Sequence, residues 1–172
     1  YRQAGINRIS FGLQSANNRE LKMLGRIHTM EEFVKSYETA RTAGFDNINI
    51  DLMSALPGQT FESFLHTLDT VLALKPEHIS MYSLILEEGT ALYEHLDRYP
   101  ALPDEDTERQ MYDTACLRLT TSMKSLILQK KERHAAIIFP TGNAKIISAS
   151  GQARHPCFAN SATPIRTALH FI

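Results

Sequence analysis

The feature that most constrains the fold of this 172-residue chain is the alternation of strand-like and helix-like segments. Apolar residues alternate with polar ones in the strand-like segments and recur at helical spacing in the helix-like segments. The predicted strands are 7–13, 47–53 and 78–86, and the predicted helices are 19–24, 29–44, 61–74, 91–96 and 104–119. This order predicts an α/β fold with a parallel sheet and right-handed crossovers, either a barrel or an open doubly wound sheet.

Ligands gather at the C-terminal strand ends in both architectures. The polar residues that the sequence places there are Gln14, Asp51 and Ser83. Asp51 lies within the apolar segment 48–53, where a carboxylate needs a partner or a ligand. We therefore expect the binding residues at this edge of the sheet.

Composition excludes several classes of function. The net charge is −1, which gives no reason to expect nucleic acid as a partner. No apolar run approaches the roughly 20 residues of a membrane span, and no secretory signal is visible. Two cysteines form no disulfide framework. We expect a cytoplasmic protein. The chain opens at Tyr1 without an initiator methionine, which we interpret as the mark of a fragment.

Several motifs occur in a fixed order. They are N-R-I-S-F-G-L-Q-S at 7–15, L-G-R-I-H at 24–28, N-I-D-L-M at 49–53, L-P-G-Q-T at 56–60, E-E-G-T at 87–90 and L-P-D-E-D-T-E at 102–108. Together they resemble radical SAM coproporphyrinogen dehydrogenases and their haem chaperone relatives, where SAM is S-adenosylmethionine. The last two motifs resemble the haem chaperone branch in particular. The resemblance covers essentially all of residues 3–117.

The resemblance implies a partial TIM-like (β/α)6 radical SAM barrel, with residues 1–117 as its C-terminal half. The family chemistry uses a [4Fe–4S] cluster held by a C-x-x-x-C-x-x-C loop, and one electron cleaves the SAM bound to the cluster into a radical. Cys116 and Cys157 have neither the spacing nor the place of that loop. We expect no cluster binding by this chain and assign it no catalytic residue and no metal ligand.

The resemblance also implies four SAM-binding residues. Arg26 would pair with the methionyl carboxylate, and Gln14 and Asp51 would hydrogen-bond the ribose hydroxyls. Ile85 would offer a backbone contact on the adenine side. Considered without the motifs, Arg26 also fits a solvated cation at a helix end, Asp51 a capping residue and Gln14 a polar strand terminus.

Two positions depart from the family pattern. Ala16 stands where the family usually has Phe, and the dipeptide at 54–55 stands where it usually has an aromatic or similar residue followed by Gly. A glycine position often needs a backbone conformation that other residues adopt only with strain. We expect Ala55 to strain its loop.

Two functions of different class remain open for the intact relative. One is a haem chaperone that binds haem and delivers it to respiratory haem proteins. The other is an oxygen-independent coproporphyrinogen III oxidase of porphyrin biosynthesis. The motifs at 87–90 and 102–108 favour the chaperone. The partners implied are SAM and either haem or coproporphyrinogen III, and the chain as given is expected to be inactive.

Residues 118–172 break the resemblance and reverse the charge, with a net of +7 against −8 in residues 1–117. Suitable codons can be assigned to the residues from Met123 onward. When the same nucleotides are read in a shifted frame, they can give E-I-S-N-F-A and later C-R-H-N, which both belong to the family pattern. We therefore expect a nucleotide gained or lost between Cys116 and Ser122, and an out-of-frame tail that is disordered or poorly packed. A basic arm with a binding role is the alternative. Open edges on half a barrel also predict poor solubility.

Overall fold

The structure is a computed structural model that describes the backbone of residues 1–122, 125–130, 134–138, 144–148 and 168–171, and the side chains of residues 1–119. Its strands are β1 Arg8–Gln14, β2 Ile48–Ser54, β3 His78–Ser83, β4 Ser125–Lys130, β5 His134–Ile138, β6 Ala144–Ser148 and β7 Ala168–Phe171. Its α-helices are α1 Asn18–Met23, α2 Met30–Thr42, α3 Phe61–Ala73, α4 Ala91–Glu94 and α5 Glu105–Ser122. The 3-10 helices are η1 Arg2–Ala4 and η2 Leu96–Arg98.

The strands form one sheet in the order β6-β5-β4-β3-β2-β1-β7. β7, β1, β2, β3 and β4 run parallel, whereas β5 and β6 are antiparallel to their neighbours. The crossover from β1 to β2 contains α1 and α2, and the crossover from β2 to β3 contains α3. The predicted α/β fold with a parallel sheet is thereby confirmed for the three strands β1, β2 and β3.

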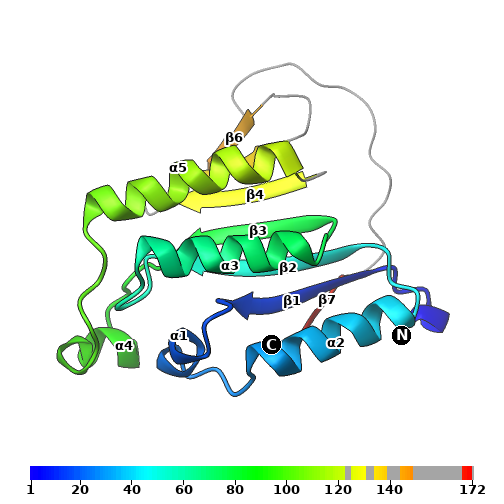
Figure 1. The fold of residues 1–172 in the computed structure, drawn as a ribbon, viewed down its shortest axis with the longest axis horizontal. Coiled ribbons are helices and arrows are strands. Elements are labelled where there is room, and N and C mark those ends of the chain that lie inside the picture. Colours follow the sequence, from blue (N-terminus) through cyan, green and yellow to red (C-terminus); the bar gives the residue numbers. More distant parts are fainter. Residues whose placement is uncertain (123–124, 131–133, 139–143, 149–167, 172) are drawn as a thin grey trace.

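Helices α2, α3 and α5 lie along one face of the sheet (Figure 1). The strands turn alternate apolar residues towards these helices, and the apolar face of each helix packs against them. The core includes Ile9, Leu13, Ile48, Ile50, Leu52, Ile79 and Met81 from the strands, with Phe33, Tyr37, Phe64, Leu68, Val71, Met111, Ala115 and Leu119 from the helices. Burial of this surface stabilises the unit at roughly 25 cal/mol per Å² of apolar area.

Side-chain caps start two of the helices. The Glu32 backbone N–H donates to the Thr29 hydroxyl at 3.3 Å, and the Thr29 N–H donates to the Glu32 carboxylate at 2.8 Å. This reciprocal pair is a capping box, and it satisfies two N–H groups that the first turn of α2 would otherwise leave unpaired. The Thr60 hydroxyl caps α3 by accepting from the Ser63 N–H at 3.2 Å.

The largest differences from the predicted boundaries lie at the ends of two elements. The third strand ends at Ser83 instead of residue 86. The Leu84 N–H still donates to the Ser54 carbonyl at 3.0 Å, but β2 ends at Ser54, so the chain has no further ladder partner there. The last predicted helix extends to Ser122 instead of stopping at 119. The predicted domain boundary at 117 therefore falls inside α5.

The predicted out-of-frame tail, 118–172, lies partly outside the described residues. Where the backbone is described, β4 pairs with β3, and β7 pairs with the free edge of β1. The frame break itself stays a prediction, because strand pairing does not report on the reading frame of the gene. Across the part of the chain that the structure describes, no helix is both long and apolar enough to cross a bilayer.

Candidate functional site

Strand pairing brings two predicted ligand residues close together, but only Gln14 lies at the C-terminal end of its strand, whereas Asp51 lies in the middle of β2. Gln14 is the last residue of β1, and its backbone partner on β2 is Leu52, the neighbour of Asp51. The register shifts between Phe11 and Gln14, and Gln14 has a left-handed backbone with a φ of 72°. Such a φ is uncommon for a residue other than glycine and often marks a functional turn. The predicted pair is therefore adjacent by strand register.

Arg26 lies three residues after the end of α1 at Met23. Gly25, with a φ of 69°, reverses the chain, and the Arg26 N–H then donates to the Leu21 carbonyl at 2.9 Å. This closing bond fixes the backbone of Arg26 against α1. The Arg26 side chain is half-buried and forms no ion pair with any described residue. Its guanidinium is therefore available for an anionic ligand.

Ile85 lies on the segment that leaves β3, two residues after its end. Its side chain is 39% exposed, which is high for an isoleucine in a chain with a well-packed core. β1, β2 and β3 all end on the side of the molecule where α1 and α4 lie (Figure 1). Ile85 thus lies at the same edge of the sheet as Gln14.

A polar cluster crosses the sheet on the face away from the helices. The Asn49 Nδ2 donates to the Ser10 Oγ and to the Asp51 Oδ1, both at 2.7 Å, and the Ser80 Oγ donates to the Asn49 Oδ1 at 3.1 Å. Ser10, Asn49 and Ser80 are each at most 4% exposed. Three strands therefore hold a series of buried side-chain hydrogen bonds that ends on Asp51, the residue predicted to bind the ribose.

A second polar network supports the loops at the same edge. Glu20 on α1 is only 3% exposed, and its carboxylate accepts from Ser15 at 2.6 Å, from Gln59 at 2.9 Å and from Ser63 at 2.5 Å. Thr67 on α3 adds a bond from the Ala16 N–H at 3.2 Å. Buried carboxylates are tolerated when donors surround them in this way. The network ties the β1–α1 turn, which follows Gln14, to the β2–α3 loop.

Ala55 follows β2 and has a φ of 59°, with its side chain buried. A left-handed backbone costs an L-residue roughly 1–2 kcal/mol relative to glycine. The expected strain at this departure from the family pattern is confirmed. The next turn needs a true glycine: a Cβ on Gly58 would lie 2.9 Å from the Pro100 Cβ, and the Gly58 φ is 69°.

A cavity of about 590 Å³ lies apart from these groups, against α2 and β1. Its walls are mainly apolar and include Phe11, Phe33, Phe45 and His28. None of the four predicted SAM ligands lines it. The cavity therefore adds no residue to the site at the C-terminal strand ends.

Comparison with known proteins places this arrangement in a family. The family described as the Radical SAM superfamily matches residues 1–71, the segment that contains β1, β2, the Glu20 network and three of the four predicted ligands. The chain thus carries part of a radical SAM domain, in residues 1–71. The resemblance seen in the motifs is thereby confirmed.

Curated relatives of this radical SAM chain are named haem chaperones. The chain is 42% identical over 113 residues to "Heme chaperone HemW" of Bacillus subtilis strain 168, covering 65% of this chain and 30% of the relative. It is 44% identical over 111 residues to HemW of Lactococcus lactis subsp. lactis, covering 64% of this chain and 29% of the relative. The radical SAM chain thus spans about 30% of the curated relatives it matches.

A solved structure has the same fold. Coproporphyrinogen III oxidase (HemN) of Escherichia coli, described as a radical SAM enzyme, superposes with a TM-score of 0.62 at 28% identity. The superposition covers 72% of this radical SAM chain and 28% of the oxidase. The predicted barrel type is confirmed by this match, together with the parallel sheet of β1, β2 and β3.

The residues present fit one of the two groups that the family generally uses. A guanidinium without an ion pair to the described residues, a carboxylate and an amide suit the carboxylate and the ribose hydroxyls of SAM. The [4Fe–4S] cluster does not fit, because the described residues hold no group of three metal-binding side chains. Cys116 lies half-buried on α5, where burial raises the pKa of its thiol. Cys157 lies outside the described residues.

Sequence reasoning missed the two polar networks. Ser10, Asn49 and Ser80 alternate with apolar neighbours on their strands, and this alternation was available as a sign of a polar sheet face. Glu20 gave no such sign, because its donors come from positions 15, 59 and 63. Only the packing of α1 against the β2–α3 loop brings them together.

Proposed function

We propose that this chain carries SAM-binding residues of a haem chaperone-like radical SAM protein. The single observation that supports the proposal is the strand register, which places Gln14 beside Leu52, the neighbour of Asp51. Arg26, on the loop after α1, forms no ion pair with the described residues. The guanidinium would hold the methionyl carboxylate of SAM through a fork of two hydrogen bonds. The amide and carboxylate would hold the ribose hydroxyls, and the Ile85 backbone would contact the adenine side.

SAM binding to the 172-residue chain tests this proposal, with equilibrium dialysis of labelled SAM as the measurement. Arg26→Met and Asp51→Asn should each weaken binding about tenfold or more, because each removes one charge-assisted contact. Arg19→Met is the matched control, since Arg19 is exposed on α1 and forms no ion pair with described residues. Equal binding by all variants, or no binding by the unaltered chain, would refute the assignment.

Haem binding and delivery to respiratory haem proteins form the finer part of the proposal. The relatives named as haem chaperones and the motifs at 87–90 and 102–108 support it. The second candidate is oxygen-independent oxidation of coproporphyrinogen III, which the likeness to the oxidase structure supports. A longer protein that includes the C-x-x-x-C-x-x-C loop separates the two. Stable haem binding without turnover favours the chaperone, and coproporphyrinogen turnover favours the oxidase.

We further propose that residues from about 118 onward are an out-of-frame continuation and that the chain by itself is inactive. The support is the loss of the family pattern, the reversal of charge and the shifted reading of the segment from Met123. The nucleotide sequence across the codons for 116–122 tests this directly. An uninterrupted frame in an independently sequenced gene would refute it.

A further inference from the structure

Asn49 has every polar atom of its side-chain amide engaged. Its Nδ2 carries two hydrogens, and one is donated to the Ser10 Oγ and the other to the Asp51 Oδ1. Its Oδ1 accepts from the Ser80 Oγ. The amide therefore has one orientation, because a flip would place its oxygen against the Asp51 carboxylate. Strands on both sides of β2 hold this orientation.

The arrangement divides the two oxygens of Asp51. Oδ1 accepts from Asn49 at 2.7 Å, whereas Oδ2 has no hydrogen-bond partner among the described residues. Asp51 itself is partly exposed, although its three supporting residues are buried. The hydrogen-bonded chain thus begins inside the sheet and leads out to one carboxylate oxygen that remains open to a ligand.

A purely structural role would not require this series of side-chain hydrogen bonds. Polar groups buried on a sheet face cost free energy even when they are paired, and apolar residues of similar size would fill the same space. Catalytic and binding groups, in contrast, work best when a second set of hydrogen bonds locks their rotamers. Locking the carboxylate beforehand removes an ordering cost from ligand binding.

We propose that Asn49 is a positioning residue, which orients the Asp51 carboxylate so that its free oxygen receives a ribose hydroxyl of an adenosyl ligand. The inference rests on the proposed SAM-binding function and names the residue that gives the ribose contact its geometry. Ser80 fixes the Asn49 amide, and Ser10 takes its second hydrogen. Adenosyl ligands that lack the hydroxyl gain nothing from this arrangement.

The test compares binding of S-adenosylhomocysteine with its 2′-deoxy and 3′-deoxy forms, measured by calorimetry on the 172-residue chain. The unaltered chain should bind S-adenosylhomocysteine about tenfold more tightly than at least one deoxy form, since a hydrogen bond to a charged group is lost. Asn49→Ala should reduce this ratio to about twofold. Ser80→Ala should reduce it to an intermediate value, because the Asn49 Oδ1 then loses the donor that helps to hold the amide in place.

Asn47→Ala is the matched control, since Asn47 precedes β2 and its Oδ1 has no hydrogen-bond partner among the described residues. It should leave the ratio unchanged. Asn49→Asp keeps the shape and places a second carboxylate beside Asp51, so at pH 8 it should weaken S-adenosylhomocysteine binding more than Asn49→Ala. An unchanged ratio in Asn49→Ala and Ser80→Ala would overturn the positioning role while the SAM site stands. Absence of binding to the unaltered chain would overturn the site and this inference together.

Discussion

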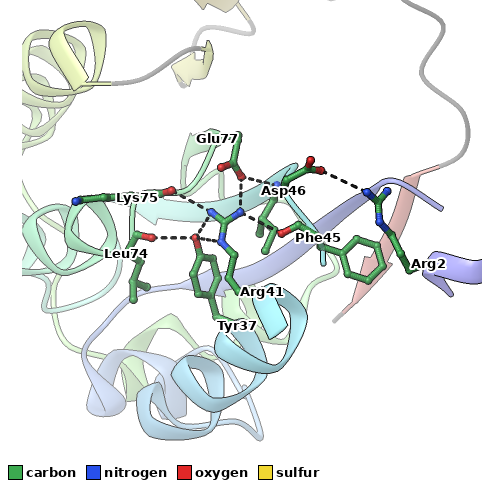
Figure 2. Close-up of polar contacts among 9 residues, drawn as sticks. Arg2, Tyr37, Arg41, Phe45, Asp46, Leu74, Lys75 and Glu77 are labelled. Carbon is green, nitrogen blue, oxygen red and sulfur yellow. Dashed lines mark hydrogen bonds and ion pairs between the residues drawn. The ribbon is translucent and has the colours of Figure 1, made fainter. Parts of the chain in front are cut away.

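The two ends of the parallel sheet differ in how far their polar side chains are paired with one another. At the N-terminal strand ends, Arg41 donates to the Tyr37 hydroxyl, to the carbonyls of Phe45 and Lys75, and to the Glu77 carboxylate at 2.9 Å (Figure 2). Towards the C-terminal strand ends, Arg26 has no ion pair and one Asp51 oxygen has no hydrogen-bond donor among the described residues. A closed network stabilises a fold, whereas open groups are available for a ligand.

The closed network also shows how burial and hydrogen bonding oppose each other. Burial raises the pKa of the Tyr37 hydroxyl against the opposing effect of Arg41. Burial alone would lower the pKa of Arg41, but the hydrogen bonds to Glu77 and Tyr37 outweigh it, so the pKa of Arg41 is raised. Glu77 also accepts from the Ile48 N–H at 2.9 Å, which ties the start of β2 to the start of β3. In barrels of this type the N-terminal face serves stability.

The Glu20 network is an exception to this difference. It lies near the C-terminal strand ends, yet its carboxylate is bonded to three donors, as in the Arg41 network. Glu20→Ala should cost about 3 kcal/mol of unfolding free energy, since three donors, two of them buried, lose a charged acceptor. It should also weaken SAM binding, because Ser15 and α1 hold Gln14 and Arg26 in place. Urea denaturation and dialysis measure the two effects. Glu62→Ala, at an exposed position on α3, is the control and should change neither.

Arg41→Met should separate stability from binding. The variant leaves the Glu77 carboxylate without its cation, and we expect a loss of about 2 kcal/mol in unfolding free energy. At a temperature where the variant is folded, SAM affinity should match that of the unaltered chain. A tenfold fall in affinity with an intact circular dichroism spectrum would contradict the separation of the two ends.

Ala55→Gly should stabilise the open end by about 0.5 kcal/mol. Relief of the left-handed strain at φ 59° exceeds the entropy that glycine adds to the unfolded chain. Ala43→Gly provides the opposite control, because the Ala43 φ is −73° and glycine only adds unfolded entropy there. Midpoints of urea unfolding report both changes, and a loss of stability in Ala55→Gly would contradict the strain.

Alkaline pH should have the smallest effect, and it acts at neither end of the sheet. Burial raises the pKa of Tyr112 on α5 from 10.0 to about 12. The folded protein therefore favours the neutral phenol, and the stability linked to it is complete below pH 10 and is lost as the pH rises through 12. Tyrosinate absorbance and unfolding midpoints between pH 9 and 12 measure this. Tyr112→Phe should remove that part of the pH dependence.

Local patterns predicted the elements because their causes lie within a few residues. The Thr29–Glu32 capping box, for example, joins residues only three positions apart. The strain at Ala55 was predicted in another way, from the glycine that the family usually has at that position. The end of β3 was predicted too late, because a strand ends where its partner ends and the partner is a distant segment. The roles of Gln14, Arg26, Asp51 and Ile85 came from family motifs and stay predictions that the binding experiments test.

The sequence by itself determined the alternation of strands and helices, their caps and the family, because spacing, cap chemistry and motifs are written along the chain. Only the tertiary structure decided which polar residues work together. Asn49 contacts Ser10 and Ser80 across distances of 39 and 31 residues in sequence, and Glu20 contacts Gln59 across 39. Parallel pairing fixes such contacts, since a register shift of one residue would turn Asn49 towards the helices and break them.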